Sequence, residues 1–135
     1  MFGVGKKRET VGLDIGASSV KAVQLRKGRG GHELVRFGIA PLHPETIVDE
    51  PARWEITLYL AKESPAPEAT TDVTPRRCQR FKARPAERFL WTHSAEGGGP
   101  AIQSGEAAAD GAGLVTVPVL RLTAARSRVK IERKP

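Results

Sequence analysis

An acid, a turn of small residues and a lysine lie close together near the start of this chain of 135 residues. Asp14 ends a short apolar run, and Lys21 belongs to the next one. A turn of small residues lets a phosphate approach backbone N–H groups, Lys21 would add a positive charge, and Asp14 could hold Mg²⁺ through its waters. The candidate phosphate-binding residues are Asp14, Gly16, Ala17, Ser18, Ser19 and Lys21. Spacing alone favours the simpler alternative of a hairpin turn with a surface lysine, because such turns are common.

A second group of residues has the composition of a site for single-stranded nucleic acid. Basic side chains neutralise phosphates and aromatic rings stack on bases. The basic residues are Arg76, Arg77, Arg80, Lys82, Arg84 and Arg88, and the aromatic residues among and after them are Phe81, Phe89 and Trp91. The alternative, which we favour, is a solvated basic stretch in an arginine-rich region.

The spacing of the histidines and the single cysteine does not indicate a metal site or a reactive thiol. The histidines His32, His43 and His93 are far apart, with no cysteine at ligand spacing, so we expect no metal centre. Cys78 is the single cysteine, which excludes a disulfide within the chain. The adjacent Arg77 could lower the pKa of its thiol, but nothing else in the sequence makes it a nucleophile, and we interpret it as a spectator thiol.

Apolar residues at alternate positions predict β-strands around Asp14 and Lys21. Apolar residues alternate at Val11, Leu13 and Ile15, and similar runs occupy residues 20–25 and 32–40. Short glycine-rich turns between the runs predict a three-stranded antiparallel meander over residues 10–40, which Pro41 ends. Further along, we expect a short helix over 54–62 and a strand over 114–122, where Pro118 would remove a ladder hydrogen bond.

Composition divides the chain at residue 50. Residues 1–50 contain 2 prolines and 3 alanines, and residues 51–135 contain 8 and 14. The whole chain has a formal charge of +7, only 5% aromatic residues and no apolar run long enough to span a bilayer. Residues 1–8 are basic with no apolar segment behind them, so we expect an intracellular chain.

A resemblance to a known family covers the first 49 residues, a little over a third of the chain. The residues from Thr10 to Leu25 read TVGLDIGASSVKAVQL, and those from Gly30 to Pro41 read GGHELVRFGIAP. Together with Gly5-Lys6-Lys7, these runs resemble the amino terminus of the PilM family of type IV pilus assembly ATPases, which is similar to FtsA and belongs to the actin-like ATPase superfamily.

The resemblance implies an α/β fold, in which the three-stranded antiparallel meander belongs to an incomplete actin-like (ribonuclease H-like) ATPase domain. It places Asp14 as the metal-associated acid, residues 16–19 as the phosphate-wrapping turn and Lys21 beside the phosphates, with ATP and Mg²⁺ as cofactors. The implied function is pilus assembly at the cytoplasmic side of the inner membrane, where a PilN-like cytoplasmic tail is the partner.

The resemblance ends near residue 50. We therefore divide the chain into a basic segment (1–9), a partial actin-like subdomain (10–50) and an Arg/Ala/Pro/Gly-rich tail (51–135), largely irregular and possibly frame-shifted. Nothing after Glu50 resembles the second phosphate hairpin or the adenosine-binding segment of the family. We accordingly expect a truncated protein with negligible ATPase activity of its own.

Overall fold

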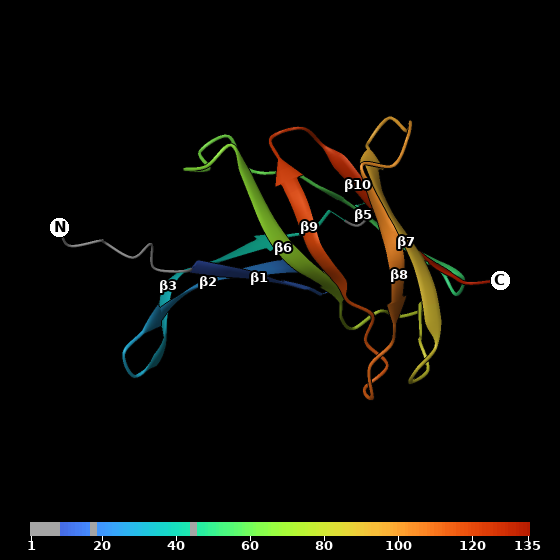
Figure 1. The fold of residues 1–135 in the computed structure, drawn as a ribbon. Coiled ribbons are helices and arrows are strands. Elements are labelled where there is room, and N and C mark those ends of the chain that lie inside the picture. The colour runs from blue at the N-terminus through green and yellow to red at the C-terminus, as the bar shows by residue number, and fades with distance from the viewer. Residues whose placement is uncertain (1–8, 17–18, 44–45) are drawn as a thin grey trace.

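The computed structural model describes residues 9–16, 19–43 and 46–135, and these residues form two five-stranded β-sheets (Figure 1). The first sheet, sheet A, has the order β3-β2-β1-β6-β9, and sheet B has the order β4-β5-β10-β7-β8. The strands of sheet A are β1 (Glu9–Ile15), β2 (Ser19–Gly28), β3 (Gly31–Pro41), β6 (Glu68–Pro75) and β9 (Val117–Thr123). Those of sheet B are β4 (Ile47–Asp49), β5 (Arg53–Leu58), β7 (Arg88–Ala95), β8 (Gln103–Ala108) and β10 (Ser127–Arg133).

The expected α/β fold is wrong, because the described part of the chain contains strands and no helix. An actin-like domain needs helices packed on its sheet. Here the second layer is another sheet, and all strand pairs except β1–β6 are antiparallel. The described residues accordingly contain no helix that could cross a membrane.

Two local expectations for the second half are also wrong. The helix expected over 54–62 is strand β5, in which Trp54 and Ile56 are buried and Glu55 between them is only partly so. That alternation has the period of a strand, whereas a helix would bury residues three and four apart. The tail beyond residue 50 is not largely irregular, since six strands from β5 to β10 lie within it.

The meander expected over residues 10–40 is present. Strands β1, β2 and β3 are consecutive antiparallel neighbours, with a bulge in β3 near Val35. The strand expected over 114–122 begins at Val117 as β9, and Pro118 lies where its register with β6 shifts. Because β9 is also an edge strand of sheet A, a missing N–H there is tolerated.

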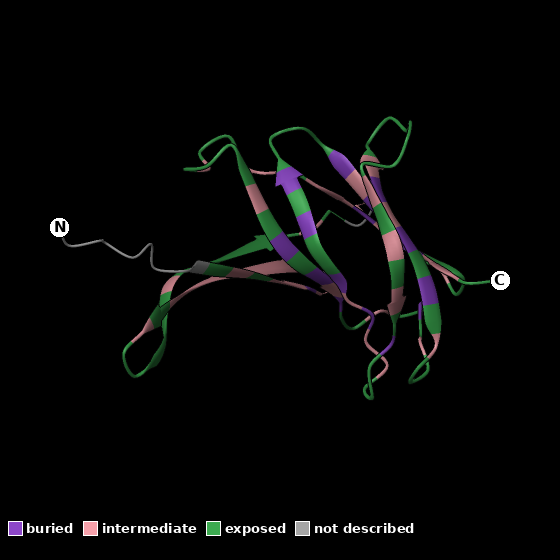
Figure 2. Ribbon diagram, viewed as in Figure 1, coloured by how far each residue is buried: buried purple, intermediate pink, exposed green. Residues whose placement is uncertain are grey.

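The core lies between the two sheets, and residues from both sides of position 50 contribute to it (Figure 2). Ile15 and Val73 come from sheet A, and Trp54, Phe89 and Ile131 come from sheet B, all at most 2% exposed. Each fully buried apolar side chain of this size contributes roughly 1.5–3 kcal/mol relative to exposure. Strand β1 is therefore held on its inner side by packing that the second half of the chain supplies.

Candidate functional site: the bend between β1 and β2

The predicted acid and lysine face each other across the hairpin of β1 and β2. Asp14 is the cross-strand partner of Lys21, one pair before Ile15 and Val20 at the end of the ladder. Successive side chains of a strand point to opposite faces, so Ile15 enters the core while Asp14 and Lys21 share the outer face of sheet A.

A third charged residue reaches this bend from β6, the parallel neighbour of β1. The Arg76 backbone N–H donates to the Ile15 carbonyl oxygen at 2.9 Å. Its side-chain Nε lies 3.4 Å from Asp14 Oδ1, an ion pair between half-exposed side chains. This pair could not be predicted from local sequence, because the two residues are 62 positions apart.

The turn itself is closed by its own backbone. The Gly16 N–H donates to the Ser19 carbonyl oxygen at 2.9 Å. Ala17 and Ser18, two of the predicted phosphate-binding residues, lie outside the described residues. Because a backbone N–H that already donates is not free for a ligand, Gly16 shapes the turn and does not bind phosphate through its own N–H.

The charges at the bend suit an anion. Among the described residues, Asp14 Oδ1 has no hydrogen-bond donor, and the Arg76 guanidinium forms an ion pair with it. Lys21 makes no ion pair with any residue the structure describes. Two cations and one carboxylate therefore share this end of the sheet, and Lys21 is the cation that forms no ion pair within the described part of the chain.

The same residues give Mg²⁺ one protein ligand. Among the described residues, no three His, Cys, Asp or Glu side chains lie close enough together to hold a metal ion. Mg²⁺ is commonly held by one or two carboxylates together with substrate phosphates and water. Asp14 thus fits Mg²⁺ that arrives with a phosphate group, and does not fit a metal bound by the protein alone.

The predicted nucleic-acid footprint lacks its stacking surface. Phe81, Phe89 and Trp91 are 5%, 0% and 7% exposed and belong to the core. The Phe81 and Phe89 rings lie 5.3 Å apart, and the Arg133 guanidinium lies over both. Bases cannot stack on rings that the core and an arginine already cover.

Several of the basic residues in this stretch are also engaged. Arg88 pairs with Glu106 at 2.6 Å, and Lys82 donates to the Cys78 carbonyl oxygen. Hydrogen bonds from Lys134 and then from Arg88 lower the pKa of the Glu106 carboxyl. These internal pairs leave less free positive charge between residues 76 and 91 than the sequence suggests.

An acid that the sequence analysis missed organises the loop after β6. The Asp49 carboxylate accepts backbone N–H groups from Gln79 at 2.6 Å, Phe81 at 2.7 Å and, less closely, Arg80 at 3.2 Å. Three successive N–H groups that converge on one carboxylate form an anion-binding concavity. In this protein the concavity is filled from within, so it is not open to a ligand.

Cys78 lies in the same loop and is half-buried. Burial and, second, the nearby Asp49 charge raise the pKa of its thiol to about 11, against an opposing effect of Lys82. The reactive form of cysteine is the thiolate, so this thiol stays protonated and unreactive near neutral pH.

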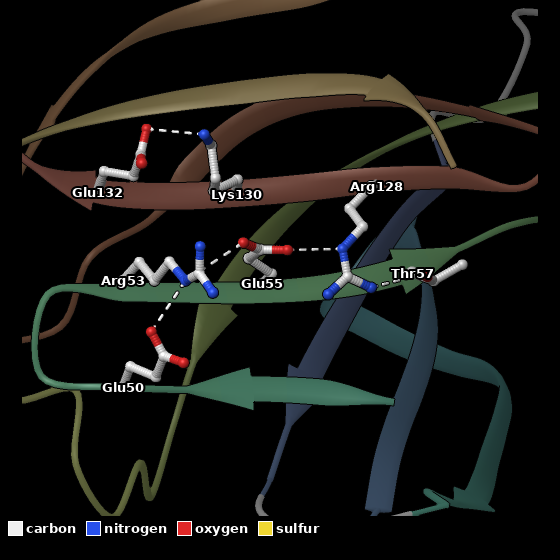
Figure 3. Close-up of polar contacts among 7 residues, drawn as sticks. All are labelled: Glu50, Arg53, Glu55, Thr57, Arg128, Lys130 and Glu132. Atoms are coloured by element: carbon white, nitrogen blue, oxygen red, sulfur yellow. Dashed lines mark hydrogen bonds and ion pairs between the residues drawn. The ribbon is translucent and has the colours of Figure 1, made fainter. Parts of the chain in front are cut away.

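Charged side chains on the outer face of sheet B neutralise one another (Figure 3). Arg53 lies 2.9 Å from Glu50 and 3.6 Å from Glu55, and Arg128 lies 2.7 Å from the other oxygen of Glu55. Acids and bases alternate along this face, so a ligand would meet little uncompensated charge there. The bend between β1 and β2 remains the stronger candidate.

Comparison with known proteins identifies no relative from which a function could be transferred: no protein family, no curated protein and no solved structure matches this chain.

Proposed function

We propose that this chain acts in type IV pilus assembly, as a PilM-like component at the cytoplasmic side of the inner membrane. Two features support the proposal: the run of residues up to Asp49 that resembles the PilM family, and the Asp14 and Lys21 pair at the bend. The actin-like architecture is not part of the proposal, because the described fold is all-β.

The ligand proposed for the bend is the phosphate chain of ATP, accompanied by Mg²⁺. Lys21 and Arg76 would bind phosphate oxygens, and Asp14 would hold Mg²⁺ through water. The observation that carries this step is the Lys21 ammonium, which lies on the same face as Asp14 and forms no ion pair with the residues that the structure describes. Binding would bias recruitment by a PilN-like cytoplasmic tail, and the chain itself would not hydrolyse ATP.

Nucleotide titration of the full chain tests this proposal, with Lys21→Gln as the variant and Lys27→Gln as its matched control. Both lysines lie on β2 and share the outer face, and they are six positions apart along the strand, roughly 20 Å. A charge-assisted hydrogen bond contributes roughly 1.5–3 kcal/mol, so Lys21→Gln should weaken Mg·ATP binding about tenfold or more, while Lys27→Gln leaves it unchanged. Equal weakening by both variants, or no binding by the parent chain, would overturn the phosphate site.

Hydrolysis provides a separate measurement. The parent chain should release no phosphate from Mg·ATP above background, because nothing after residue 50 resembles the second phosphate hairpin of the family. Metal-dependent hydrolysis that disappears in Asp14→Asn would contradict this expectation. Binding of a synthetic PilN cytoplasmic tail, measured with and without Mg·ATP, tests the partner; a chain that never binds the tail would remove the pilus assignment.

A further inference from the structure

The hairpin of β2 and β3 leaves one side of sheet A unpaired. Strand β3 has 11 residues and forms the edge of the sheet, with β2 as its single neighbour among the described strands. The hairpin extends away from sheet B, and Figure 2 shows no buried residue along it. An edge strand of this length presents a row of backbone N–H and C=O groups to an incoming strand.

Large apolar side chains cover the outer face of the same hairpin. Leu34, Phe37 and Ile39 are 61%, 68% and 60% exposed. In the ladder, Leu34 lies opposite Leu25 and Phe37 lies opposite Val23, and Ile39 is two residues beyond Phe37 on the same face. Five apolar side chains therefore share one face: Val23, Leu25, Leu34, Phe37 and Ile39. We call these five residues the outer patch. Contiguous exposed apolar side chains usually mark an interaction surface.

Positive charge surrounds the outer patch. Residues 19–41 contain five basic residues and one acid, Glu33. Lys21, Lys27, Arg29 and Arg36 form no ion pair with the residues that the structure describes. Electrostatic complementarity therefore favours an acidic partner on this side of the protein.

We propose that β3 receives an extended, acidic strand of another protein, which pairs with residues 36–41 and lengthens sheet A. This segment follows the bulge, and its ladder with β2 is unbroken from Arg36 to Pro41. Side chains on one face of the added strand would lie beside Phe37 and Ile39 and should be apolar. Those on the other face would lie beside Arg36, where acids are favoured.

Two other occupants fit the hairpin less well. A lipid bilayer would cover the outer patch, but it offers no partner for the unpaired backbone of β3, and such groups are costly in hydrocarbon. A second copy of this chain would pair β3 with itself, which brings two equally basic hairpins together. Like charges directly across a ladder destabilise it.

Fluorescence anisotropy with the full chain tests the proposal. The probe is a labelled peptide of four Glu-Val repeats, and the control is the same peptide with Lys in place of Glu. The acidic peptide should bind and the basic peptide should not. Two N-methylated acidic peptides, blocked on alternate residues, should differ, because only one set of N–H groups faces β3. Strand addition would be overturned if the acidic peptide does not bind, or if both methylated peptides still bind as well as the unmodified one.

Three variants locate the site. Phe37→Thr keeps a good strand former and should weaken the acidic peptide about tenfold or more, because burial of the aromatic ring is lost. Ile102→Thr, at another exposed apolar residue, should change nothing. Arg36→Glu should weaken binding of the acidic peptide, because it places an acid beside the acidic face of the added strand. Two other results would replace the proposal if the acidic peptide fails to bind. A dimer in sedimentation that Phe37→Thr abolishes would show self-association. Flotation with phosphatidylserine vesicles that Phe37→Thr abolishes would show a membrane-binding surface.

Discussion

Removal of the Asp49 carboxylate should weaken the whole fold, although this side chain lies outside the core. Asp49 ends β4 and accepts N–H groups from residues 79–81, which stand 30 to 32 positions further along the chain. The contact fixes the loop that delivers Phe81 to the core, where its ring packs against Phe89. In Asp49→Ala the loop loses its acceptor, and the packing of Phe81 loses its support.

The magnitude follows from the three donors. A hydrogen bond to a charged group contributes roughly 1.5–3 kcal/mol, but bonds that share one acceptor do not add. The N–H groups of Gln79 and Arg80 are at exposed contacts and regain water, whereas the contact with the Phe81 N–H is part-buried. We therefore expect Asp49→Ala to lower the free energy of unfolding by about 2–3 kcal/mol, and Asp49→Asn, which keeps one carbonyl oxygen, by about half of that.

Urea denaturation followed by tryptophan fluorescence measures the effect, since Trp54 and Trp91 are both buried. Asp110→Ala is a matched control: this carboxylate accepts the N–H groups of Ala112 and Leu114 within its own loop. Its loss should cost less, because no distant segment depends on it. A change within about 0.5 kcal/mol in Asp49→Ala, which is ordinary for a surface substitution, would refute the reasoning.

Three further predictions follow from single contacts. Gly113→Ala should lower the melting temperature strongly, because its φ is +74° and the new Cβ would lie 2.6 Å from a carbonyl oxygen, whereas Gly111→Ala meets nothing within 4 Å and should be tolerated. The Cys78 pKa, raised from 9.0 to about 11, should make the fold less stable as pH rises from 9 toward 11, because the unfolded thiol loses its proton first; urea midpoints across that range should fall, and Cys78→Ser should remove that part of the fall. Lys134→Gln should raise the pKa of the Glu106 carboxyl toward its ordinary value in an NMR titration, and an unchanged pKa would contradict the ion pair.

Local alternation predicted the meander because each of its strands can be recognised within ten residues or so. Val11, Leu13 and Ile15 lie on one face of β1 as their spacing required, with Ile15 fully buried. The fold class came from the resemblance, and local pattern offered no check on it. The layer that packs against a meander is formed by residues distant in the sequence, and here that layer is sheet B.

Composition concealed the strands of the second half. Strand β8 reads QSGEAA, whose small side chains carry little β-propensity, yet they pair with β7 from Arg88 to His93. Gly105 lies against the Trp91 ring, so this glycine provides room for an aromatic side chain. Phe89, Trp91 and His93 are all buried, and their alternate positions are typical of a strand. The arginines around them instead favoured the interpretation of an exposed basic stretch.

The candidate site could be predicted only in part, because the bend draws its charges from both halves of the chain. Asp14 and Lys21 follow from the hairpin, but Arg76 arrives through the parallel pairing of β1 with β6. The inner face of β1 is held by Val73 and the opposite sheet, and this packing fixes the direction in which Asp14 points. The first 50 residues alone would therefore lack both the second cation and the support of the acid. An anion site at this bend, if nucleotide titration finds one, belongs to the whole chain.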